Sequence, residues 1–164
     1  MFLKSTMPHF IKYKILSDLH CVVEYYYGKL GLTDLIEYQK SVATDENYNP
    51  SFNIISDIRD SEITAKEQEV VTFIDFVKKQ RPVAKRQSAV ITDTPKQFVV
   101  GELYKMHLGT LPMNVTVIST VDAALQWVGI TINNKLLIEK TILDLKNSRT
   151  TNLQKDQSFI SFNS

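Results

Sequence analysis

The chain has 164 residues, of which 43% are hydrophobic and 23% charged, as is usual for one globular domain. With 19 Lys and Arg against 18 Asp and Glu, the net charge is +1, and no long-range field favours nucleic acid or an anionic membrane. The single cysteine excludes an intrachain disulfide and a cysteine-based zinc site. No stretch approaches the ~20 apolar residues that span a bilayer, and the N-terminal residues do not form a signal-type apolar core. We therefore expect a cytoplasmic protein without a nucleic-acid partner or a membrane span.

The first predicted elements are two strands that form a hairpin. Residues Phe10–Leu16 alternate between lysine and apolar side chains, which is the period-2 pattern of a half-buried strand. Ser17 and Asp18 suit a turn, and the following residues, His20–Tyr27, are rich in β-branched and aromatic side chains before Gly28. Two strands joined by so short a turn pair in antiparallel fashion.

Helical and strand patterns alternate from Thr33 onward. Helices are predicted at about 33–44, 64–81, 94–109 and 120–128, and strands at about 52–58, 88–92 and 115–118. Thr64 and Glu67 form a predicted capping box at the second helix. Thr94 and Gln97 repeat this pattern at the third helix, with a proline at its first position. The alternation predicts an α/β fold with a mixed, mostly parallel sheet, an N-terminal antiparallel hairpin and helices packed on the sheet.

Apolar side chains at helical spacing continue through the third helix and the C-terminal region. In the third helix the predicted buried stripe is Phe98, Val99, Leu103 and Met106. Residues 1–130 are predicted to form one α/β domain. Residues 131–146 are predicted to add a C-terminal helix, whose apolar positions are Leu136, Ile138, Ile142 and Leu145. Residues 147–164 are polar and are predicted to be a mobile tail.

Polar side chains follow the predicted strands of the parallel part of the sheet. In open α/β sheets, ligands bind beyond the carboxyl ends of the strands. The candidate ligand-binding or partner-binding residues at this edge are Asp57, Arg59, Asp60, Thr92, Asp93, Ser119 and Thr120. The alternative interpretation is structural: such residues also serve as helix caps and turns, and Asp57 with Arg59 also suits an internal ion pair.

Known catalytic and metal-binding patterns are absent from the sequence. There is no glycine-rich phosphate loop, no G-x-S-x-G and no H-E-x-x-H, and the three histidines lie far apart along the chain. Cys21 lies within a predicted strand and is expected to be a small buried hydrophobe rather than a nucleophile. We therefore predict no catalytic residue, no metal and no cofactor. An enzyme with a site around Asp57, Arg59 and Asp93 remains the third interpretation.

A cluster of basic residues surrounds Pro82. It consists of Lys78, Lys79, Arg81, Lys85 and Arg86. Basic side chains complement the C-terminus of a helix and stay solvated there. Docking of an acidic partner is the alternative for this cluster.

Three segments resemble parts of the STAS fold of anti-sigma-factor antagonists. They are FNIISDIRDSEITAKEQEVV (Phe52 to Val71), QSAVITD, and VISTVDAALQWV (Val117 to Val128). With the predicted order of strands and helices, the chain is similar to STAS/SEC14-like bacterial proteins over about residues 8–130. This resemblance implies a non-enzymatic regulatory or protein-interaction module that binds a protein partner or a second copy of itself.

The resemblance also carries expectations about individual residues. In antagonists of this type a serine at the start of the second helix is phosphorylated, and Ser61 and Thr64 are the positions to which this site can be carried over. The segment reads DSEITAKE and departs from the family pattern by having no glycine. The SEC14-like similarity implies the alternative function, a small-molecule or lipid-binding protein with an apolar pocket between sheet and helices. The residues expected to line it are Tyr25, Tyr27, Phe73 and Trp127.

Overall fold

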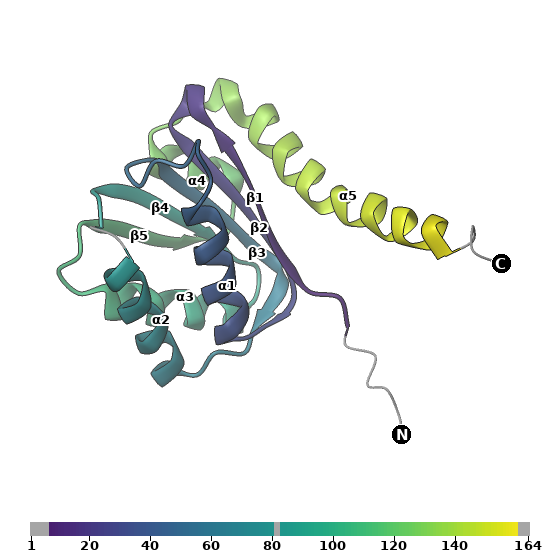
Figure 1. The fold of residues 1–164 in the computed structure, drawn as a ribbon. Helices are drawn as coiled ribbons and strands as arrows, with labels where there is room; N and C mark the ends of the chain where they lie inside the picture. Colours follow the sequence, from purple (N-terminus) through teal and green to yellow (C-terminus); the bar gives the residue numbers. More distant parts are fainter. Residues whose placement is uncertain (1–6, 81–82, 161–164) are drawn as a thin grey trace.

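Five strands form one sheet in the part of the chain that the computed structural model describes, residues 7–80 and 83–160 without the side chains of 149–160. The strands are β1 (Phe10–Leu16), β2 (Cys21–Leu30), β3 (Asn53–Ile63), β4 (Arg86–Ile91) and β5 (Met113–Ile118). They lie side by side in the order β1-β2-β3-β4-β5 (Figure 1). Among these five described strands, β1 and β2 pair in antiparallel fashion and the other neighbours pair in parallel. The predicted mixed α/β sheet with an N-terminal hairpin is confirmed.

The second strand of the hairpin is longer than predicted. A 3-10 turn, Ser17–Leu19, joins β1 to β2, and β2 continues through Gly28 to Leu30. Gly28 has a φ of +78°, and a Cβ there would lie 2.5 Å from the carbonyl oxygen of Pro8. Glycine therefore lets the strand continue through a close approach of two backbones instead of ending it.

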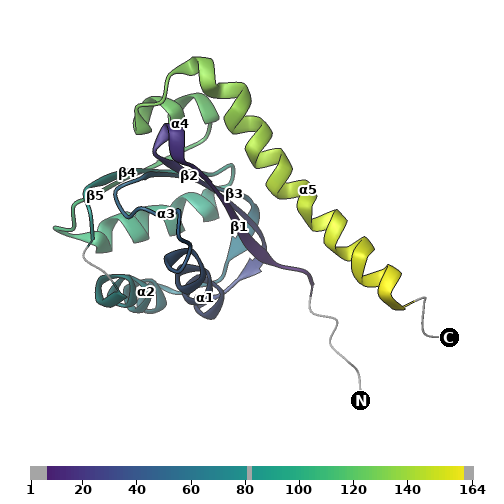
Figure 2. The same cartoon turned by 45° about the horizontal axis from the view of Figure 1, so that its top comes forward.

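The helices cover both faces of the sheet. On one face lie α1 (Leu32–Ala43), α2 (Glu67–Gln80) and α3 (Pro95–Leu108), and on the other lie α4 (Val121–Val128) and α5 (Lys135–Ile160) (Figure 2). A 3-10 turn at Ile132–Asn134 joins α4 to α5. None of the helices in the described residues is both long and apolar enough to cross a membrane.

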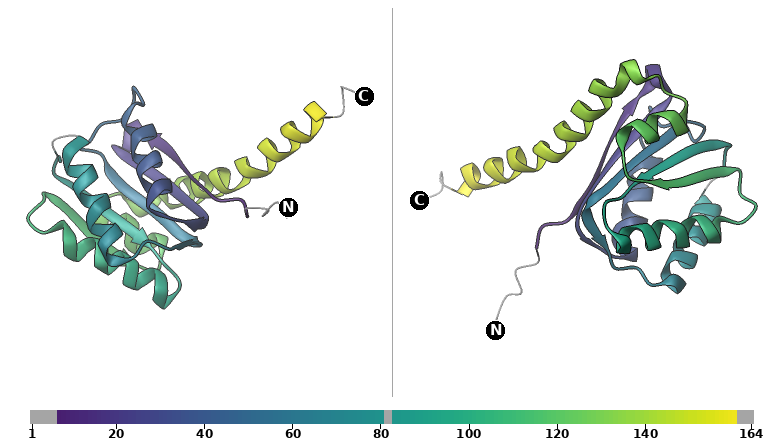
Figure 3. Two further views of the ribbon diagram at one scale, coloured as in Figure 1. Left: turned by 60° about the horizontal axis from the view of Figure 1, so that its bottom comes forward. Right: turned by 180° about the vertical axis from the view of Figure 1, so that it is seen from behind.

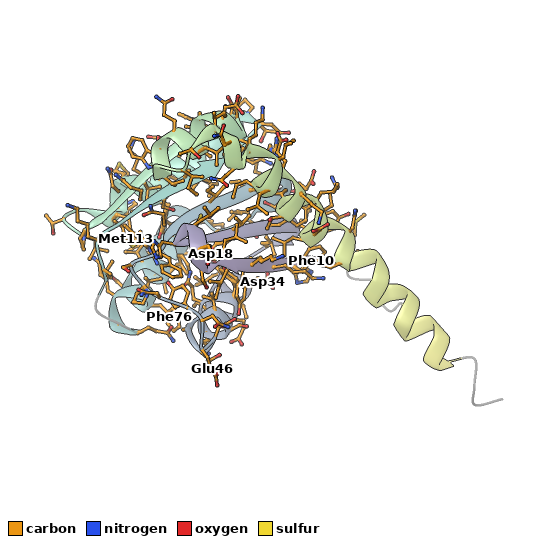
Figure 4. All side chains as sticks on the ribbon, turned by 90° about the horizontal axis from the view of Figure 1, so that it is seen from above. Phe10, Asp18, Asp34, Glu46, Phe76 and Met113 are labelled. Atoms are coloured by element: carbon orange, nitrogen blue, oxygen red, sulfur yellow. The ribbon has the colours of Figure 1, made fainter. Side chains whose placement is uncertain are left out.

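Each face of the sheet has its own hydrophobic core, because successive side chains of a strand point to opposite faces. Facing α4 and α5, the core is a single apolar cluster, and its largest fully buried members are Tyr25, Ile55, Ile91, Leu125 and Ile138. Facing α1, α2 and α3, the apolar side chains form two clusters. Side chains from the strands and the helices extend into the space between them (Figure 4).

Helix α2 begins later than the predicted capping box. The carboxylate of Glu69 accepts a hydrogen bond from the backbone N–H of Lys66 at 3.1 Å. The hydroxyl of Thr64 instead donates to the carbonyl oxygen of Leu30 at 3.3 Å. The predicted box of Thr64 with Glu67 is therefore wrong, because Thr64 still belongs to the pairing of β3 with β2.

Helix α3 begins as predicted but buries a different face. The hydroxyl of Thr94 accepts a hydrogen bond from the N–H of Gln97, which completes the predicted capping box. The predicted buried stripe of Phe98, Val99, Leu103 and Met106 is wrong, because Phe98, Val99 and Met106 are exposed. The residues that face inward are Gln97, Gly101, Tyr104 and Leu108.

Helix α5 extends beyond the predicted end at Lys146. It lies beside β1 and β2 on the α4 side and continues past them (Figure 3). Its backbone is helical to Ile160, so the expected tail from residue 147 begins as helix, and residues 161–164 lie outside the described part. Residues 147–160 contain neither proline nor glycine, so no residue there interrupts a helix that packing of Ile138 and Ile142 has started.

Close packing of α3 on β5 gives a test of this helix orientation. A Cβ at Gly101 would lie 2.8 Å from Cγ2 of Val117. We expect Gly101→Ala to lower the free energy of unfolding by about 1–3 kcal/mol, although alanine is the better helix former. Chemical denaturation measures the change, and adding Val117→Ala should recover part of it. A stabilised Gly101→Ala variant would contradict the close approach of α3 to β5.

Candidate functional site

The first of the predicted strand-end residues lie within β3 and not after its end. Pairing of β3 with β4 ends at Asp57 and Ile91, but β3 continues along β2 to Ile63. The prediction that this strand ends at about Ile58 is therefore wrong, and Arg59 and Asp60 are strand residues. Beyond Asp57, one edge of β3 has no strand of the described chain beside it, so its backbone groups need other partners.

Gln97 supplies those partners. Its amide nitrogen donates to the carbonyl oxygens of Arg59 and Ser61, each at 3.0 Å. Its amide oxygen accepts from the N–H groups of Asp93 and Thr94 at 3.0 and 3.3 Å. The residue is 7% exposed. The sequence predicts Gln97 as part of a helix cap, but no local pattern indicates that it joins α3 to the open edge of β3.

Asp57 and Arg59 form a closed ion pair. The Arg59 side chain donates from Nε to Oδ1 of Asp57 at 2.9 Å and from Nη2 to Oδ2 at 2.8 Å. The carboxylate also accepts the backbone N–H of Arg59 at 3.1 Å. Asp57 is 2% exposed, and its hydrogen bonds raise the pKa of Arg59 above its usual range. The pair is thus the internal ion pair of the structural interpretation, and two parallel hydrogen bonds join one edge of the guanidinium to the carboxylate.

Asp60 connects β3 to the hairpin and to α5. One of its carboxylate oxygens accepts hydrogen bonds from the hydroxyl of Tyr25 and from Nζ of Lys146, the latter at 3.0 Å. The Tyr25 hydroxyl, followed by Lys146, lowers the pKa of Asp60. We call Asp57, Arg59, Asp60, Tyr25 and Lys146 the strand-edge cluster; its carboxylates are already paired with groups of this chain.

The remaining predicted site residues lie at the ends of β4 and β5. Thr92 is buried, and its N–H donates to the carbonyl oxygen of Ile118 at 2.8 Å. Asp93 is exposed and close enough to Arg59 to raise the pKa of the guanidinium. Ser119 is also exposed. The hydroxyl of Thr120 accepts the N–H of Ala123 at 3.2 Å and caps α4. The structure therefore brings Asp93 near the strand-edge cluster and places Thr120 in a capping role.

The two hydroxyls at the predicted phosphorylation positions are engaged with the backbone. Ser61 is buried, and its hydroxyl donates to the carbonyl oxygen of Ile58 at 2.8 Å. Thr64 is exposed, and its hydroxyl donates to Leu30. A phosphate on Ser61 would require this part of β3 to open, whereas Thr64 is accessible without such a change.

Neither a metal cluster nor an activated cysteine is present in the described part of the chain. It contains no group of three or more His, Cys, Asp or Glu side chains placed to hold a metal ion. Cys21 is fully buried, and this burial raises the pKa of its thiol to about 12. The thiol is therefore protonated at neutral pH and behaves as a small hydrophobe.

A cavity of about 100 Å³ lies between the sheet and helices α1, α2 and α3. Phe73 lines it, as predicted, together with Tyr26, Tyr104 and Met113. The other predicted lining residues, Tyr25, Tyr27 and Trp127, pack on the opposite face with α4 and α5. Their assignment to this pocket is wrong: Tyr25 and Tyr27 belong to the β2 face that packs towards α4 and α5, and Trp127 lies on α4 itself. We call this space the helix-side cavity.

Buried polar groups lie around the helix-side cavity. Arg86 is 9% exposed, so it is not part of the solvated basic cluster expected from the sequence. Glu24, on the same face of the sheet, is 4% exposed. Its carboxylate accepts hydrogen bonds from the hydroxyls of Tyr38, Ser56 and Tyr26 at 2.6, 2.6 and 3.0 Å. The sequence did not lead us to expect either residue to be buried, although a charged side chain within an apolar strand is a signal of a buried polar site.

The outer face of α3 is an exposed apolar surface. It consists of Phe98, Val99, Leu103 and Met106, with Glu102 and Lys105 between them. Phe98 is 48% exposed, Val99 55% and Met106 61%. Contiguous apolar surface of this kind is typical of interaction sites.

No protein-family model matches the sequence, and no curated protein matches it. Among solved structures, the chain is similar to an uncharacterised protein of the DUF3478 family with a SpoIIAA-like fold, from Shewanella loihica PV-4. The TM-score is 0.53 at 15% identity, and the match covers 76% of this chain and 98% of that one. This similarity confirms the predicted STAS-like fold: the chain has a SpoIIAA-like α/β fold.

The four hydrogen bonds of Gln97 give a test of its bridging role. Gln97→Leu keeps the size of the side chain but leaves two carbonyl and two N–H groups without this partner. We expect the free energy of unfolding to fall by about 2–4 kcal/mol in chemical denaturation. The matched control, Gln68→Leu on the exposed surface of α2, should change it by less than about 0.5 kcal/mol. Equal effects of the two substitutions would contradict the bridge.

The pKa of Asp60 gives a second test. Because its folded-state pKa is lowered, its contribution to stability is present above the unfolded pKa of about 3.9 and is lost as the pH falls through the folded value. Asp60→Asn should lower the free energy of unfolding by about 1 kcal/mol at pH 7, since the carboxylate is partly exposed. Denaturation at several pH values should show this difference shrinking below about pH 4. Asp18→Asn, at an exposed turn, is the control, and a pH-independent effect of Asp60→Asn would contradict this account.

Proposed function

We propose that this chain is a non-enzymatic, STAS-like protein-interaction module that pairs with a second copy of itself through the outer face of α3. The observation that carries the proposal is the exposure of Phe98, Val99 and Met106 on one helix face. Burial of large apolar side chains is the main driving force of association. Helix α3 buries a glycine and a glutamine but exposes a phenylalanine and a methionine, so covering its outer face with a partner would bury apolar surface and favour association.

The outer face of α3 is self-complementary in an antiparallel arrangement. Apolar residues stand at both ends of the face, Val99 and Met106, about 10 Å apart along the helix. Glu102 and Lys105 lie between them and form an ion pair at 3.8 Å within the helix. A two-fold axis near Leu103 places Val99 against Met106 of the second copy and Glu102 near its Lys105. Such a patch meets the requirement of a symmetric dimer, in which one surface recognises itself.

The chemistry of the strand-edge cluster supports a non-enzymatic role. Its two carboxylates bind Arg59, Tyr25 and Lys146, so a substrate would have to displace these groups. Cys21 is buried and protonated. General acid–base or nucleophilic catalysis needs a group with free hydrogen-bonding capacity within reach of the substrate. The cluster is better suited to hold β3, the hairpin and α5 together.

A second candidate function is the binding of a small molecule, and the helix-side cavity favours it. The cavity lies between the sheet and its helices, where the sequence led us to expect a pocket. Apolar side chains and a few polar groups line it, as in small-molecule sites generally. The two functions are compatible, because the outer face and the cavity lie on opposite sides of α3.

The association state of Val99→Glu tests the first proposal. We expect the wild-type protein to be a dimer in sedimentation equilibrium over a wide concentration range. Val99→Glu should be monomeric, because it buries a carboxylate against Met106 of the second copy at a cost of several kcal/mol. The control is Leu136→Glu on α5, where the side chain is 79% exposed.

Charge reversal identifies the partner as a second copy. Glu102→Lys should weaken the dimer, and Glu102→Lys combined with Lys105→Glu should restore it, since the two charges then exchange places across the axis. A strictly monomeric wild-type protein would overturn the proposal. Loss of a dimer in Leu136→Glu but not in Val99→Glu would move the interface to α5 and would also overturn it.

A further inference from the structure

A buried cation lies beside the helix-side cavity. Arg86 opens β4 and is 9% exposed. Its Nη1 donates to the hydroxyl of Tyr48 at 2.8 Å, and its Nη2 contacts the sulfur of Met113 at 3.7 Å. Its buried Nε has no hydrogen-bond partner among the described residues. A buried guanidinium with an unused donor is costly unless something binds it.

The unused donor belongs to the edge of Arg86 that binds carboxylates. The Nε–H and one Nη2–H of a guanidinium point the same way and together fit the two oxygens of a carboxylate. Arg59 shows this arrangement in the same protein, with Asp57 at 2.9 and 2.8 Å. Among the described residues, the corresponding edge of Arg86 meets only the thioether of Met113, which is a weak acceptor and part of a flexible side chain.

No carboxylate of the described chain fills this position. None of the ion pairs among the described residues includes Arg86. Glu24 is the buried acid on the same face of the sheet, and its oxygens accept three hydroxyl hydrogen bonds. The positive charge of Arg86 therefore has no anionic partner within this part of the molecule.

We infer that the helix-side cavity binds a short-chain carboxylate, whose anionic group pairs with the Nε and Nη2 edge of Arg86. The inference rests on the second candidate function and names its ligand class. The side chain of Arg86 lines the cavity, together with the apolar Ile54, Val90 and Met113. A volume of about 100 Å³ is smaller than an engineered cavity of about 150 Å³ that holds benzene, so it suits an acid of about four or five carbon atoms.

Two hydroxyls in the cavity wall have capacity for the same anion. Ser88 and Tyr104 both line the cavity, and neither hydroxyl has a hydrogen-bond partner among the described residues. Burial raises the pKa of Tyr104 to about 12, so its hydroxyl is a donor at neutral pH. A carboxylate accepts up to four hydrogen bonds, and these groups can supply them beside Arg86.

Methionine methyl NMR gives a local test with butyrate as the probe and butyramide as its neutral counterpart. Met113 lines the cavity and contacts Arg86 (it is labelled in Figure 4), whereas Met106 lies on the outer face of α3. We expect butyrate to shift the Met113 methyl signal in a saturable way and to leave that of Met106 unchanged. Butyramide should bind at least about tenfold more weakly.

Substitution of Arg86 tests whether its positive charge binds the carboxylate of butyrate. Arg86→Leu should weaken butyrate binding at least about tenfold and leave butyramide binding unchanged. Arg86→Lys should give intermediate binding, because lysine keeps the charge without the fork. Lys85→Leu removes a charge from the neighbouring exposed residue and should leave binding as in the wild type. If Arg86→Leu does not fold, two other measurements test the pairing. They are the preference of the wild-type protein for butyrate over butyramide and the effect of Arg86→Lys on butyrate binding.

The possible results distinguish carboxylate recognition by Arg86 from small-molecule binding in the cavity generally. Equal binding of butyrate and butyramide would overturn the pairing with Arg86 while leaving small-molecule binding in place. Equal loss of butyrate binding in Arg86→Leu and Lys85→Leu would also overturn the pairing. If neither compound shifts the Met113 signal, both the ligand class and the second candidate function fail.

Discussion

The structure depends on how the backbone groups at the open edge of β3 find hydrogen-bond partners. This strand continues along β2 after β4 has ended, and buried backbone carbonyls without partners are costly. Gln97 meets the requirement from the first turn of α3. Because the same side chain also accepts the N–H groups of Asp93 and Thr94, it joins the strand, the connecting loop and the helix at one buried point.

The position of Gln97 sets the rotation of α3, and the rotation determines both candidate functions. With Gln97 inward, the residues one, two and three turns later on the same side are Gly101, Tyr104 and Leu108. Gly101 allows the helix to approach Val117, and Tyr104 reaches the helix-side cavity. Phe98, Val99 and Met106 are consequently turned outward. One hydrogen-bonded side chain thus accounts for an exposed apolar face and for part of a cavity wall.

The two faces of the sheet differ in the polarity of the side chains that they bury. Towards α4 and α5 the side chains are apolar and closely packed, and the polar atoms at the rim are paired, as Asp60 is with Tyr25 and Lys146. Towards α1, α2 and α3 the sheet buries Glu24 and Arg86. Buried charges lower stability unless they are paired or hydrogen-bonded, and Glu24 reaches that state with three hydroxyls. Arg86 is hydrogen-bonded only in part, because its Nε has no partner among the described residues. This distinguishes Arg86 from Glu24.

The order of strands and helices, the antiparallel hairpin and the STAS-like fold could be predicted from the sequence. These depend on local periodicity and on capping residues such as Thr94 and Thr120, which act within a few positions along the chain. Local patterns do not determine where β3 ends, which face of α3 is buried or where Arg86 lies, because these features depend on contacts between distant parts of the chain. The end of β3 depends on a neighbouring strand, and the buried face of α3 on backbone groups of β3 that lie 36 and 38 positions away. Local hydrophobicity favoured the opposite face of α3, but the hydrogen-bonding needs of β3 outweighed it.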